Sequence, residues 1–442
     1  MAFETENDLF ELKEDGLYIW DILRFFVYLD YTYGPQPVRR PKRRLLDVLL
    51  KQVRRGASLI SFLFRKSRPN LFYIHSRDKM PDGRHFDRNA HDFLQRMAGE
   101  SHILEIYENP HTDYFYPVSL FNFGNLVRRA YRLFYHRRKH DLLVEKINGQ
   151  LGLHWNNRII NLHIGNFKAD RLFYRWLFRL KRVKRVYTTT MPKGIYCAAR
   201  ECGMEVMEFQ HGIIDTGHIS YNYPAELRDS KKVYCPDVLL TFSDFWCQDV
   251  HFPGKRVVAV GNSVLAADME MGVKLPAPDP KSRMIVFISG DVFGRSLAEL
   301  AIGYIRLYPE DTIAFKLHVN QFNHRQEYDD LFRDFPAIRV FTNEQPTEKL
   351  ILSCSAIVLI QSTVAYQALQ AGIPVFIYKQ LTYYRHAHIF NNRNVRLIDD
   401  ASQIVLTGKP NQPGPRDIFF EAFDEKVYQL FSNDGSSIRT VR

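Results

Sequence analysis

The chain has 442 residues, 45% of them hydrophobic and 25% charged, and this length favours two domains over a single core. The formal net charge of +11 favours an acidic partner, whether nucleic acid, anionic lipid or a phosphorylated substrate. Five cysteines without a CxxC pair argue against a zinc site and favour a reducing, cytoplasmic compartment, and no apolar run is long enough to cross a bilayer.

The N-terminal part of the chain turns from acidic to strongly basic. The opening MAFETENDLFELKEDG is unlike a secretion signal, and the pattern after it predicts a helix that ends near Gly34. Residues 39–68 carry eleven Lys or Arg residues against the single Asp47, and 125–140 and 167–187 are also basic, with apolar residues at helical spacing. These stretches suit either solvated helix faces or a peripheral surface for anionic lipid of the inner membrane. Nucleic acid is disfavoured because no RNP, KH or helix-turn-helix pattern accompanies the charge.

From about residue 154, short apolar runs alternate with helical segments. Strands are predicted at 158–165, 184–190, 205–212, 237–245 and 255–263. Residues 192–203 are predicted to form a helix that stops at Gly203. This alternation is typical of a parallel sheet covered by helices.

Residues 266–282 contain three prolines and no periodicity, so they are predicted to link a first domain, 1–265, to a second, 283–414. Strands of the second domain are predicted at 283–290, 312–319, 338–343, 356–362 and 374–379, with a helix after each of the first four. The segment 415–442 is predicted to be a helix to about residue 432 and then a tail. The predicted fold class is α/β, with two Rossmann-like doubly wound domains that face a central cleft.

Three strand ends of the second domain carry groups that suit an anion. Gly290 lets backbone N–H groups approach a phosphate, and Arg295 can bind one through two N–H groups. Lys316 and His318 alternate along a strand and therefore point to the same side. Ser362–Thr363 begins a helix, where free N–H groups and the dipole favour negative charge. Each group also has a purely structural interpretation, as a βα turn, a capped turn or a helix cap.

At these residues the chain resembles a family. K-x-H after a strand, then a Ser/Thr-started helix running into A-L-x-x-G-I-P-V, resembles the donor half of GT-B glycosyltransferases. The similarity points to bacterial capsule and lipopolysaccharide enzymes, including the sialyl- and Kdo-transferases that use CMP-sugars. Q-H-G after an earlier strand, CPDVLLTFSDFW and KRVVAVGNS also fit that group, so the resemblance covers residues 185–380.

The resemblance implies a role for each strand-end group of the second domain. Lys316 and His318 would bind the donor phosphates or the sugar carboxylate. Ser362 and Thr363 would bind a phosphate at the start of the helix. Gly290 and Arg295 would line the same pocket. The chain departs from the family at Val319, where proline is usual, and at Gln367 and Gln370, where a ribose-binding Glu is common. No metal or cofactor is expected, because these cationic groups can neutralise a leaving phosphate and no DxD sequence stands at a strand end.

The first domain would then supply the acceptor site and the catalytic base. Asp215 and His211, in the stretch EVMEFQHGIIDTGHISYNYP, are the candidate bases. The acceptor side is expected to include Gln210, Gly212, His218 and Tyr221, with tyrosines stacked on sugar rings. A rival polar loop contains His75, Asp78 and Asp87.

The sequence therefore predicts a cytoplasmic enzyme, peripheral on the inner membrane, that moves a sugar from a nucleotide-sugar to a capsule or lipopolysaccharide glycan. A CMP-sugar such as Kdo or sialic acid is the favoured donor and a UDP-sugar the alternative. A polyol-phosphate transferase, a sugar-nucleotide epimerase of the same fold, or a non-catalytic protein that binds anionic lipid or nucleic acid are the other hypotheses. Gln367 and Gln370 argue against an epimerase, which needs carboxylates around the sugar.

Overall fold

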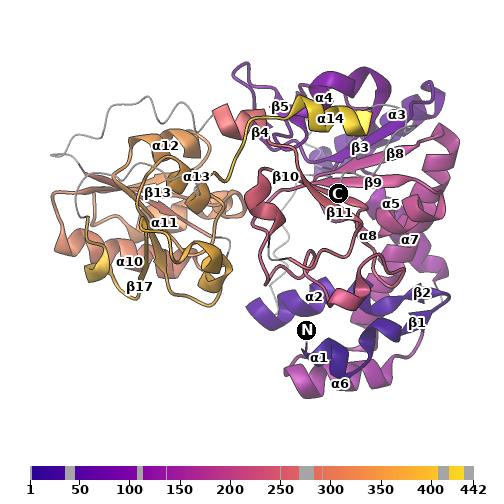
Figure 1. Ribbon diagram of the computed structural model, residues 1–442, viewed down its shortest axis with the longest axis horizontal. Helices are drawn as coiled ribbons and strands as arrows, with labels where there is room; N and C mark the ends of the chain where they lie inside the picture. The colour runs from indigo at the N-terminus through magenta and orange to yellow at the C-terminus, as the bar shows by residue number, and fades with distance from the viewer. Residues whose placement is uncertain are drawn as a thin grey trace.

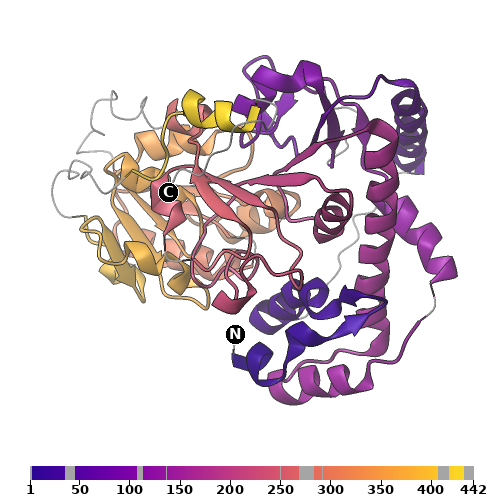
Figure 2. The same cartoon turned by 45° about the vertical axis from the view of Figure 1, so that its right-hand side comes forward.

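A computed structural model describes residues 2–34, 45–106, 113–135, 137–248, 250–267, 283–290, 292–406 and 418–432. The chain forms two α/β domains that lie side by side, each built on a parallel sheet with helices on its faces (Figure 1). This confirms the predicted fold class. The hairpin of β1 (Lys13–Glu14) and β2 (Leu17–Tyr18) and the helices α1 (Ala2–Glu6), α2 (Ile19–Tyr33) and α6 (Asp141–Leu151) form a small unit beside the first domain, which we call the N-terminal unit (Figure 2).

The first sheet has seven strands in the order β11-β10-β9-β8-β3-β6-β7, and every neighbouring pair is parallel. Its strands are β3 (Asn70–Ile74), β6 (Ser101–Glu105), β7 (Leu120–Phe121), β8 (Arg185–Thr188), β9 (Glu205–Phe209), β10 (Val238–Thr241) and β11 (Arg256–Ala259). All residues of the interior strand β3 are buried, as expected where helices cover both faces of a parallel sheet.

Helices of the first domain and the N-terminal unit surround this sheet. They are α1 (Ala2–Glu6), α2 (Ile19–Tyr33), α3 (Leu45–Phe64), α4 (His91–Met97), α5 (Gly124–Phe134), α6 (Asp141–Leu151), α7 (Asn157–Lys181) and α8 (Lys193–Glu201), and the hairpin strands are β1 (Lys13–Glu14) and β2 (Leu17–Tyr18). A second hairpin, β4 (Asp78–Lys79) with β5 (His85–Phe86), follows β3.

The strand predicted at 158–165 is wrong, because these residues lie inside α7. Ile160, Ile164 and Phe167 are buried at helical spacing, and the Asn156 side chain caps the helix by accepting from two backbone N–H groups. His163 is therefore not at a strand end; its ring stacks on Phe26, with centroids 3.8 Å apart. The true partners of β8 are β9 and the unpredicted strand β3.

The second sheet has six strands in the order β14-β13-β12-β15-β16-β17, again all parallel. Its strands are β12 (Met284–Ile288), β13 (Thr312–Lys316), β14 (Ile338–Phe341), β15 (Ala356–Leu359), β16 (Val375–Tyr378) and β17 (Val395–Ile398), and its helices are α10 (Gly294–Leu307), α11 (Arg325–Leu331), α12 (Thr347–Ser353) and α13 (Val364–Gln370). The first five strands fall where the sequence predicts them. The sixth, β17, was not predicted.

After β17 the chain returns to the first domain. Residues 418–424 are not helical, and α14 (Glu425–Ser432) is shorter than the predicted terminal helix. The yellow α14 lies on the first domain in Figure 1, where Phe431 is buried and its carbonyl oxygen accepts from Arg185. The predicted linker falls mostly on residues 268–282, which lie outside the described residues.

Candidate active site at the boundary between the domains

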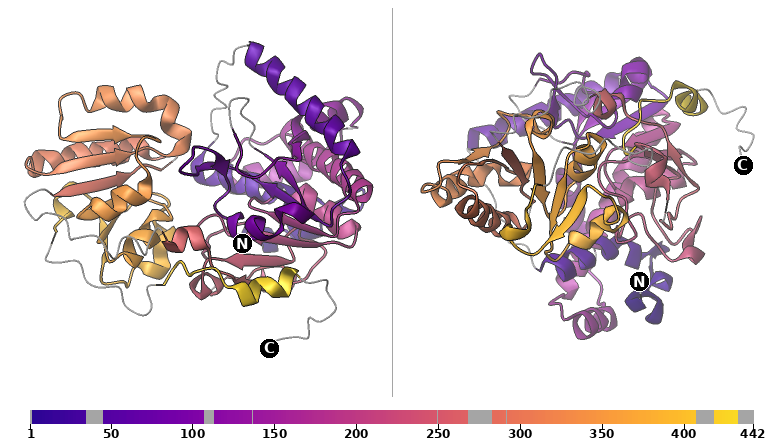
Figure 3. Two further views of the ribbon diagram at one scale, coloured as in Figure 1. Left: turned by 90° about the horizontal axis from the view of Figure 1, so that it is seen from above. Right: turned by 60° about the vertical axis from the view of Figure 1, so that its left-hand side comes forward.

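The loops that follow the carboxyl ends of the strands in one domain contact the corresponding loops of the other. Asp215, after β9, accepts a hydrogen bond from Arg385 Nε at 2.9 Å, and Arg385 lies in the 3-10 helix Tyr383–Ile389 after β16. Arg88, after β5, forms an ion pair with Glu348 of α12 at 2.8 Å. These contacts place the candidate residues of both sheets at one boundary between the domains, which Figure 3 shows from two further directions.

Glu208 of β9 is an acidic side chain inside an otherwise apolar strand. It is fully buried, and its two carboxyl oxygens accept hydrogen bonds from the hydroxyl groups of Tyr196 and Tyr221. Burial raises the pKa of Glu208 to about 8, more than the two tyrosines lower it. The carboxyl group is therefore largely protonated at neutral pH.

His211 stands beside this carboxyl group and opens toward solvent. Its Nδ1 lies 3.4 Å from the Tyr221 hydroxyl and 3.8 Å from Glu208 Oε1, and 30% of the side chain is exposed. The surrounding protein and, to a smaller extent, Arg77 lower the pKa of His211 to about 4. The imidazole is therefore neutral at physiological pH and has a nitrogen available to accept a proton.

Asp215, the other predicted base, is turned toward the second domain. It is buried, and Arg385 holds its Oδ2. Asp215 therefore lies in a contact between the domains, on the same loop as His211. Its assignment as the base stays a prediction.

The remaining predicted acceptor-side residues mostly support the loop. Gln210 is fully buried and ties β9 to β10: its Oε1 accepts from Phe242 N at 3.0 Å and its Nε2 donates to Gly212 O at 2.9 Å. The His218 ring packs against the Tyr221 ring, with centroids 4.4 Å apart and an angle of 31° between the planes. Tyr221 is itself buried and bound to Glu208, so it is not available to stack on a sugar.

Helix α2 holds this loop from behind. Arg24 is buried, paired with Glu4, and donates to the carbonyl oxygens of Ile219 and Asn222. Tyr223 donates to Asp21 at 2.8 Å. The N-terminal unit therefore fixes the backbone that carries His218 and Tyr221.

In the second domain, the groups predicted to bind the donor are largely occupied by the protein itself. Lys316 is buried, and its ammonium group donates to the carbonyl oxygens of Thr342 and Gln345. The His318 ring accepts from Asn320 N at 3.3 Å and so caps the following turn. Both residues stabilise loops at the strand ends, which is the structural interpretation considered above.

Ser362 and Thr363 also have partners or roles within the fold. The Ser362 N–H donates to His386 Nε2 at 3.2 Å, and the Ser362 hydroxyl accepts from Val364 N. Thr363 is the first residue before α13 and makes no side-chain cap. His386, which sequence reasoning missed, therefore takes one of the N–H groups predicted for a phosphate.

Gly290 and Arg295 differ in position. Gly290 lies at the end of β12, where an added β-carbon would meet no atom within 4 Å, so the backbone there is open. Arg295 is on the outside of α10, 80% exposed and 3.4 Å from Glu299. The structure brings Gly290 to the same sheet edge as Lys316, His318 and Ser362 but does not bring Arg295 there.

Gln370, one of the two glutamines on the helix for which the resemblance implies a ribose-binding Glu, holds the chain segment that returns to the first domain. Its Oε1 accepts from Phe419 N at 2.9 Å and Phe420 N at 2.8 Å, and its Nε2 donates to Phe420 O. Both the oxygen and the nitrogen of its amide group are therefore hydrogen-bonded to the backbone.

Several buried polar atoms at the boundary have no hydrogen-bond partner within the described part of the chain. They are Asp215 Oδ1, Tyr366 OH, Thr382 Oγ1 and His386 Nδ1. Tyr366 and His386 are neighbours, with ring centroids 5.5 Å apart. Each unsatisfied buried group costs on the order of 1–3 kcal/mol, so a water or a polar ligand group is expected to meet them.

The aspartates of the rival polar loop have partners within the protein. Asp87 is buried and accepts from His75 N at 2.9 Å, Asn89 N at 3.0 Å and Thr189 Oγ1 at 2.6 Å, and burial raises its pKa to about 6. Asp78 binds Arg88, the residue that reaches Glu348. The loop therefore anchors strand ends and joins the domains.

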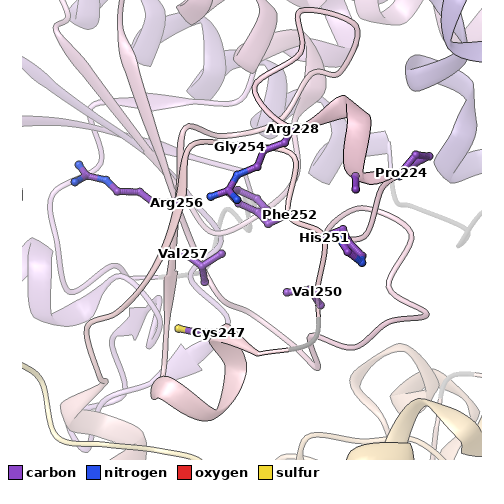
Figure 4. A pocket seen from close by; sticks show the side chains of 10 residues that line it. Pro224, Arg228, Cys247, Val250, His251, Phe252, Gly254, Arg256 and Val257 are labelled. Atoms are coloured by element: carbon purple, nitrogen blue, oxygen red, sulfur yellow. The ribbon is translucent and has the colours of Figure 1, made fainter. Parts of the chain in front are cut away.

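A cavity of 430 Å³ lies elsewhere in the first domain, beside β11 (Figure 4). Arg228, His251 and Arg256 are among its lining residues, and Arg256 extends away from the other side chains in the figure and lies 3.6 Å from Glu205. None of the predicted site residues lines it. Within the described ranges, no group of three His, Cys, Asp or Glu side chains is arranged to hold a metal ion.

No protein-family model matches the sequence, and no curated protein matches it significantly. Among solved structures, the chain is similar to UDP-GlcNAc 2-epimerase from Methanocaldococcus jannaschii, with a TM-score of 0.47, 11% identity, and coverage of 82% of this chain and 99% of the other. MurG from Acinetobacter baumannii has a TM-score of 0.43 and 10% identity, and the match covers 82% of this chain and 91% of MurG. The UDP-forming trehalose-phosphate synthase from Burkholderia xenovorans has a TM-score of 0.42 and 12% identity, and the match covers 75% of this chain and 88% of the synthase.

The two parallel-sheet domains form a GT-B-like fold. All three superpositions are loose and the identities are low, so the function has to be inferred from the side chains of this chain. The resemblance to sialyl- and Kdo-transferases stays a prediction.

Proposed function

We propose that the chain is a glycosyltransferase that moves a sugar from a nucleotide-sugar to a hydroxyl group of an acceptor, with His211 as the base. The observation that carries this proposal is the neutral, solvent-accessible imidazole of His211, backed by Tyr221 and the buried Glu208 at the end of β9. A neutral imidazole near the boundary of two sheet edges suits proton abstraction from a bound hydroxyl.

In the proposed reaction, the Nδ1 proton of His211 faces the Tyr221 oxygen, which leaves the Nε2 lone pair for the acceptor. As the acceptor oxygen bonds to the anomeric carbon, its proton passes to Nε2 and the bond from that carbon to the nucleotide phosphate breaks. The nucleotide leaves with the electron pair. Glu208 acts as a positioning residue, since its protonated carboxyl group keeps Tyr221, and through it His211, in place.

We place the leaving phosphate near Arg385 and the polar atoms of Tyr366, Thr382 and His386 that lack partners. Arg385 has five N–H donors, of which Nε binds Asp215. A cation held in a buried ion pair is preorganised to stabilise charge that develops on a phosphate. This chemistry needs neither a metal nor a resident cofactor.

A CMP-sugar such as CMP-Kdo or CMP-sialic acid is the donor we favour, with UDP-sugars as the alternative. The acceptor we propose is a bacterial surface glycan of the capsule or of lipopolysaccharide, reached at the cytoplasmic face. Both choices rest on the sequence resemblance over residues 185–380.

The test is a screen of CMP-, UDP- and GDP-sugars for a rise in melting temperature, followed by assays for nucleotide release with glycan acceptors. A shift with one nucleotide and release that depends on acceptor are expected. If no nucleotide raises the melting temperature, the transferase proposal fails. If NMR shows the sugar changing configuration without any acceptor, the chain is an epimerase instead.

A further inference from the structure

The outer face of α3 carries a continuous stripe of exposed apolar side chains. Leu50, Val53, Ala57, Ile60 and Phe64 recur at intervals of three and four residues, which places them on one side of the helix. The exposed fractions of Val53, Ile60 and Phe64 are 69%, 60% and 86%. Single exposed apolar residues are ordinary, but a stripe running along a helix of this length marks a surface that contacts something else.

The opposite face of α3 is docked on the first domain. Phe62 is buried, and the Arg54 guanidinium lies over the Phe121 ring, 4.6 Å from its centroid. Lys181, at the end of α7, donates to the carbonyl oxygens of Leu63 and Arg65. These contacts hold the inner face and the C-terminal end of α3 against the first domain. The apolar stripe therefore faces away from the domain.

Helices α5 and α7 add apolar side chains on the same margin of the first domain, away from the second domain (Figure 2). On α7, Leu172, Trp176 and Leu180 are exposed at four-residue spacing beside Arg175 and Arg179. On α5, Leu133 and Phe134 at the C-terminal end are both more than four-fifths exposed. The margin therefore combines apolar and cationic side chains on three helices.

The charge on this margin is mainly positive. Residues 45–68 contain six Lys or Arg residues and one acidic residue, Asp47, although Arg54 lies on the docked face and Arg55 is buried. In α7 the one acidic residue, Asp170, is paired with Arg128. Basic side chains beside an apolar stripe are complementary to a partner that has an apolar interior and an anionic exterior. Negatively charged phospholipid has that chemistry, since the basic groups meet the headgroups while the apolar groups enter the acyl boundary.

We propose that α3, with the exposed residues of α7, is the surface by which this protein docks on an anionic membrane. A second copy of the chain is a poorer occupant, because pairing two such helices would bring together two surfaces with an excess of cations. None of the described helices is long and apolar enough to span a bilayer, so the contact is a peripheral one. The inference stands without the proposed chemistry, and its test needs no substrate.

The test is flotation of the full-length protein with vesicles of phosphatidylcholine alone and of phosphatidylcholine mixed with phosphatidylglycerol. The wild type is expected to float with the anionic vesicles, to stay behind with the neutral ones, and to be released by salt. The double variant Ile60→Glu/Phe64→Glu should bind the anionic vesicles at least about tenfold more weakly, because it removes two apolar contacts and adds two negative charges. Both side chains are exposed, so the variant should fold normally, as its melting temperature will show.

Leu307→Glu is the matched control. Leu307 ends α10 in the second domain and is 53% exposed, so its replacement adds one negative charge, against two in the α3 variant, at a comparable apolar site away from α3. It should bind vesicles like the wild type. Unchanged binding by the α3 variant, or equal flotation with neutral vesicles, overturns the proposal. A dimer in lipid-free solution that the α3 variant converts to a monomer also overturns it, in favour of a second copy as the occupant.

Discussion

At the carboxyl end of the first sheet, the Glu208 carboxyl group and the Tyr221 hydroxyl are turned toward another side chain, His211, which remains accessible. At the carboxyl end of the second sheet, Lys316 and Ser362 are turned toward the backbone and toward His386. Both edges carry the polar residues that a ligand site of a parallel α/β fold requires. Among the described residues considered at the two edges, His211 on the first edge is oriented by a second side chain and is also accessible to solvent.

The difference shows why a polar residue at a strand end is an ambiguous signal. Loops that follow buried strands have many backbone carbonyl and N–H groups to satisfy, and a lysine or histidine nearby can do so. A catalytic group is distinguished instead by a second side chain that orients it. The following predictions test this contrast between the two edges.

The largest expected effect is that of His211→Ala. Loss of a general base lowers turnover by about 10³-fold, while nucleotide binding should be nearly unchanged. His324→Ala is the matched control, because the His324 side chain is 31% exposed, close to the 30% of His211, but pairs with Glu327 in the second domain. Steady-state kinetics with calorimetric nucleotide binding would check both, and equal turnover of the two variants would remove His211 from the mechanism.

The pH dependence of kcat/KM tests independently whether His211 is the base. Because the pKa of His211 is lowered to about 4, the base stays deprotonated through neutral pH, and activity should be lost only as pH falls through about 4. An acid limb near pH 6.5 would mean that a histidine with an ordinary pKa is the base.

The next effect concerns the ion pair that joins the domains. Asp215→Ala leaves Arg385 buried without its partner and should lower the free energy of unfolding by about 3 kcal/mol in urea titrations. The double variant Asp215→Ala/Arg385→Leu should lose less than the single one. If Asp215→Ala kept its stability and lost turnover alone, the sequence-based assignment of Asp215 as the base would be restored.

Glu208 should impose a pH dependence on stability. Its pKa is raised in the folded state, so its contribution is complete below the unfolded value near 4.5 and is lost as pH rises through about 8. Wild-type protein should lose on the order of 3 kcal/mol from this group between pH 5 and pH 8. Glu208→Gln should remove that part of the slope in urea titrations at the two pH values; parallel slopes would show that Glu208 is not titrating there.

The smallest effects are expected on the second edge. Lys316→Met should lower stability by about 1–2 kcal/mol, because two carbonyl groups lose their donor, with nucleotide affinity following only the loss of folded protein. Arg295→Ala should change affinity by less than about twofold, since the side chain points to solvent. A tenfold loss of nucleotide affinity in either variant would show that the substituted residue does bind the donor.

The strands of the second sheet could be predicted because each is an apolar run followed by a helix with its own pattern. In the first sheet, β3 could not be recognised this way, because a hairpin, β4–β5, follows it rather than a helix. Residues 158–165 were misassigned because the adjacent Ile159 and Ile160 imitate a short strand, although the wider spacing belongs to α7.

The candidate site was predictable only in part. His211 and Tyr221 could be found because they follow a buried strand, and Glu208 left a signal that was missed, an acidic residue within the apolar run of β9. Arg385 could not be paired with Asp215 from the sequence, since 170 positions separate them and only the packing of the domains brings them together.

The described residues at the end of the first domain lie against the segment that returns to it from the second domain. Asn262 N donates to Glu421 O at 2.8 Å, and Gly261, with φ of 74°, lies so near the return segment that a β-carbon there would sit 2.1 Å from Ala422 O. These contacts join the points where the chain leaves the first domain and re-enters it. Any separation of the two domains must therefore break the ion pairs Asp215–Arg385 and Arg88–Glu348 while this junction keeps their near ends together.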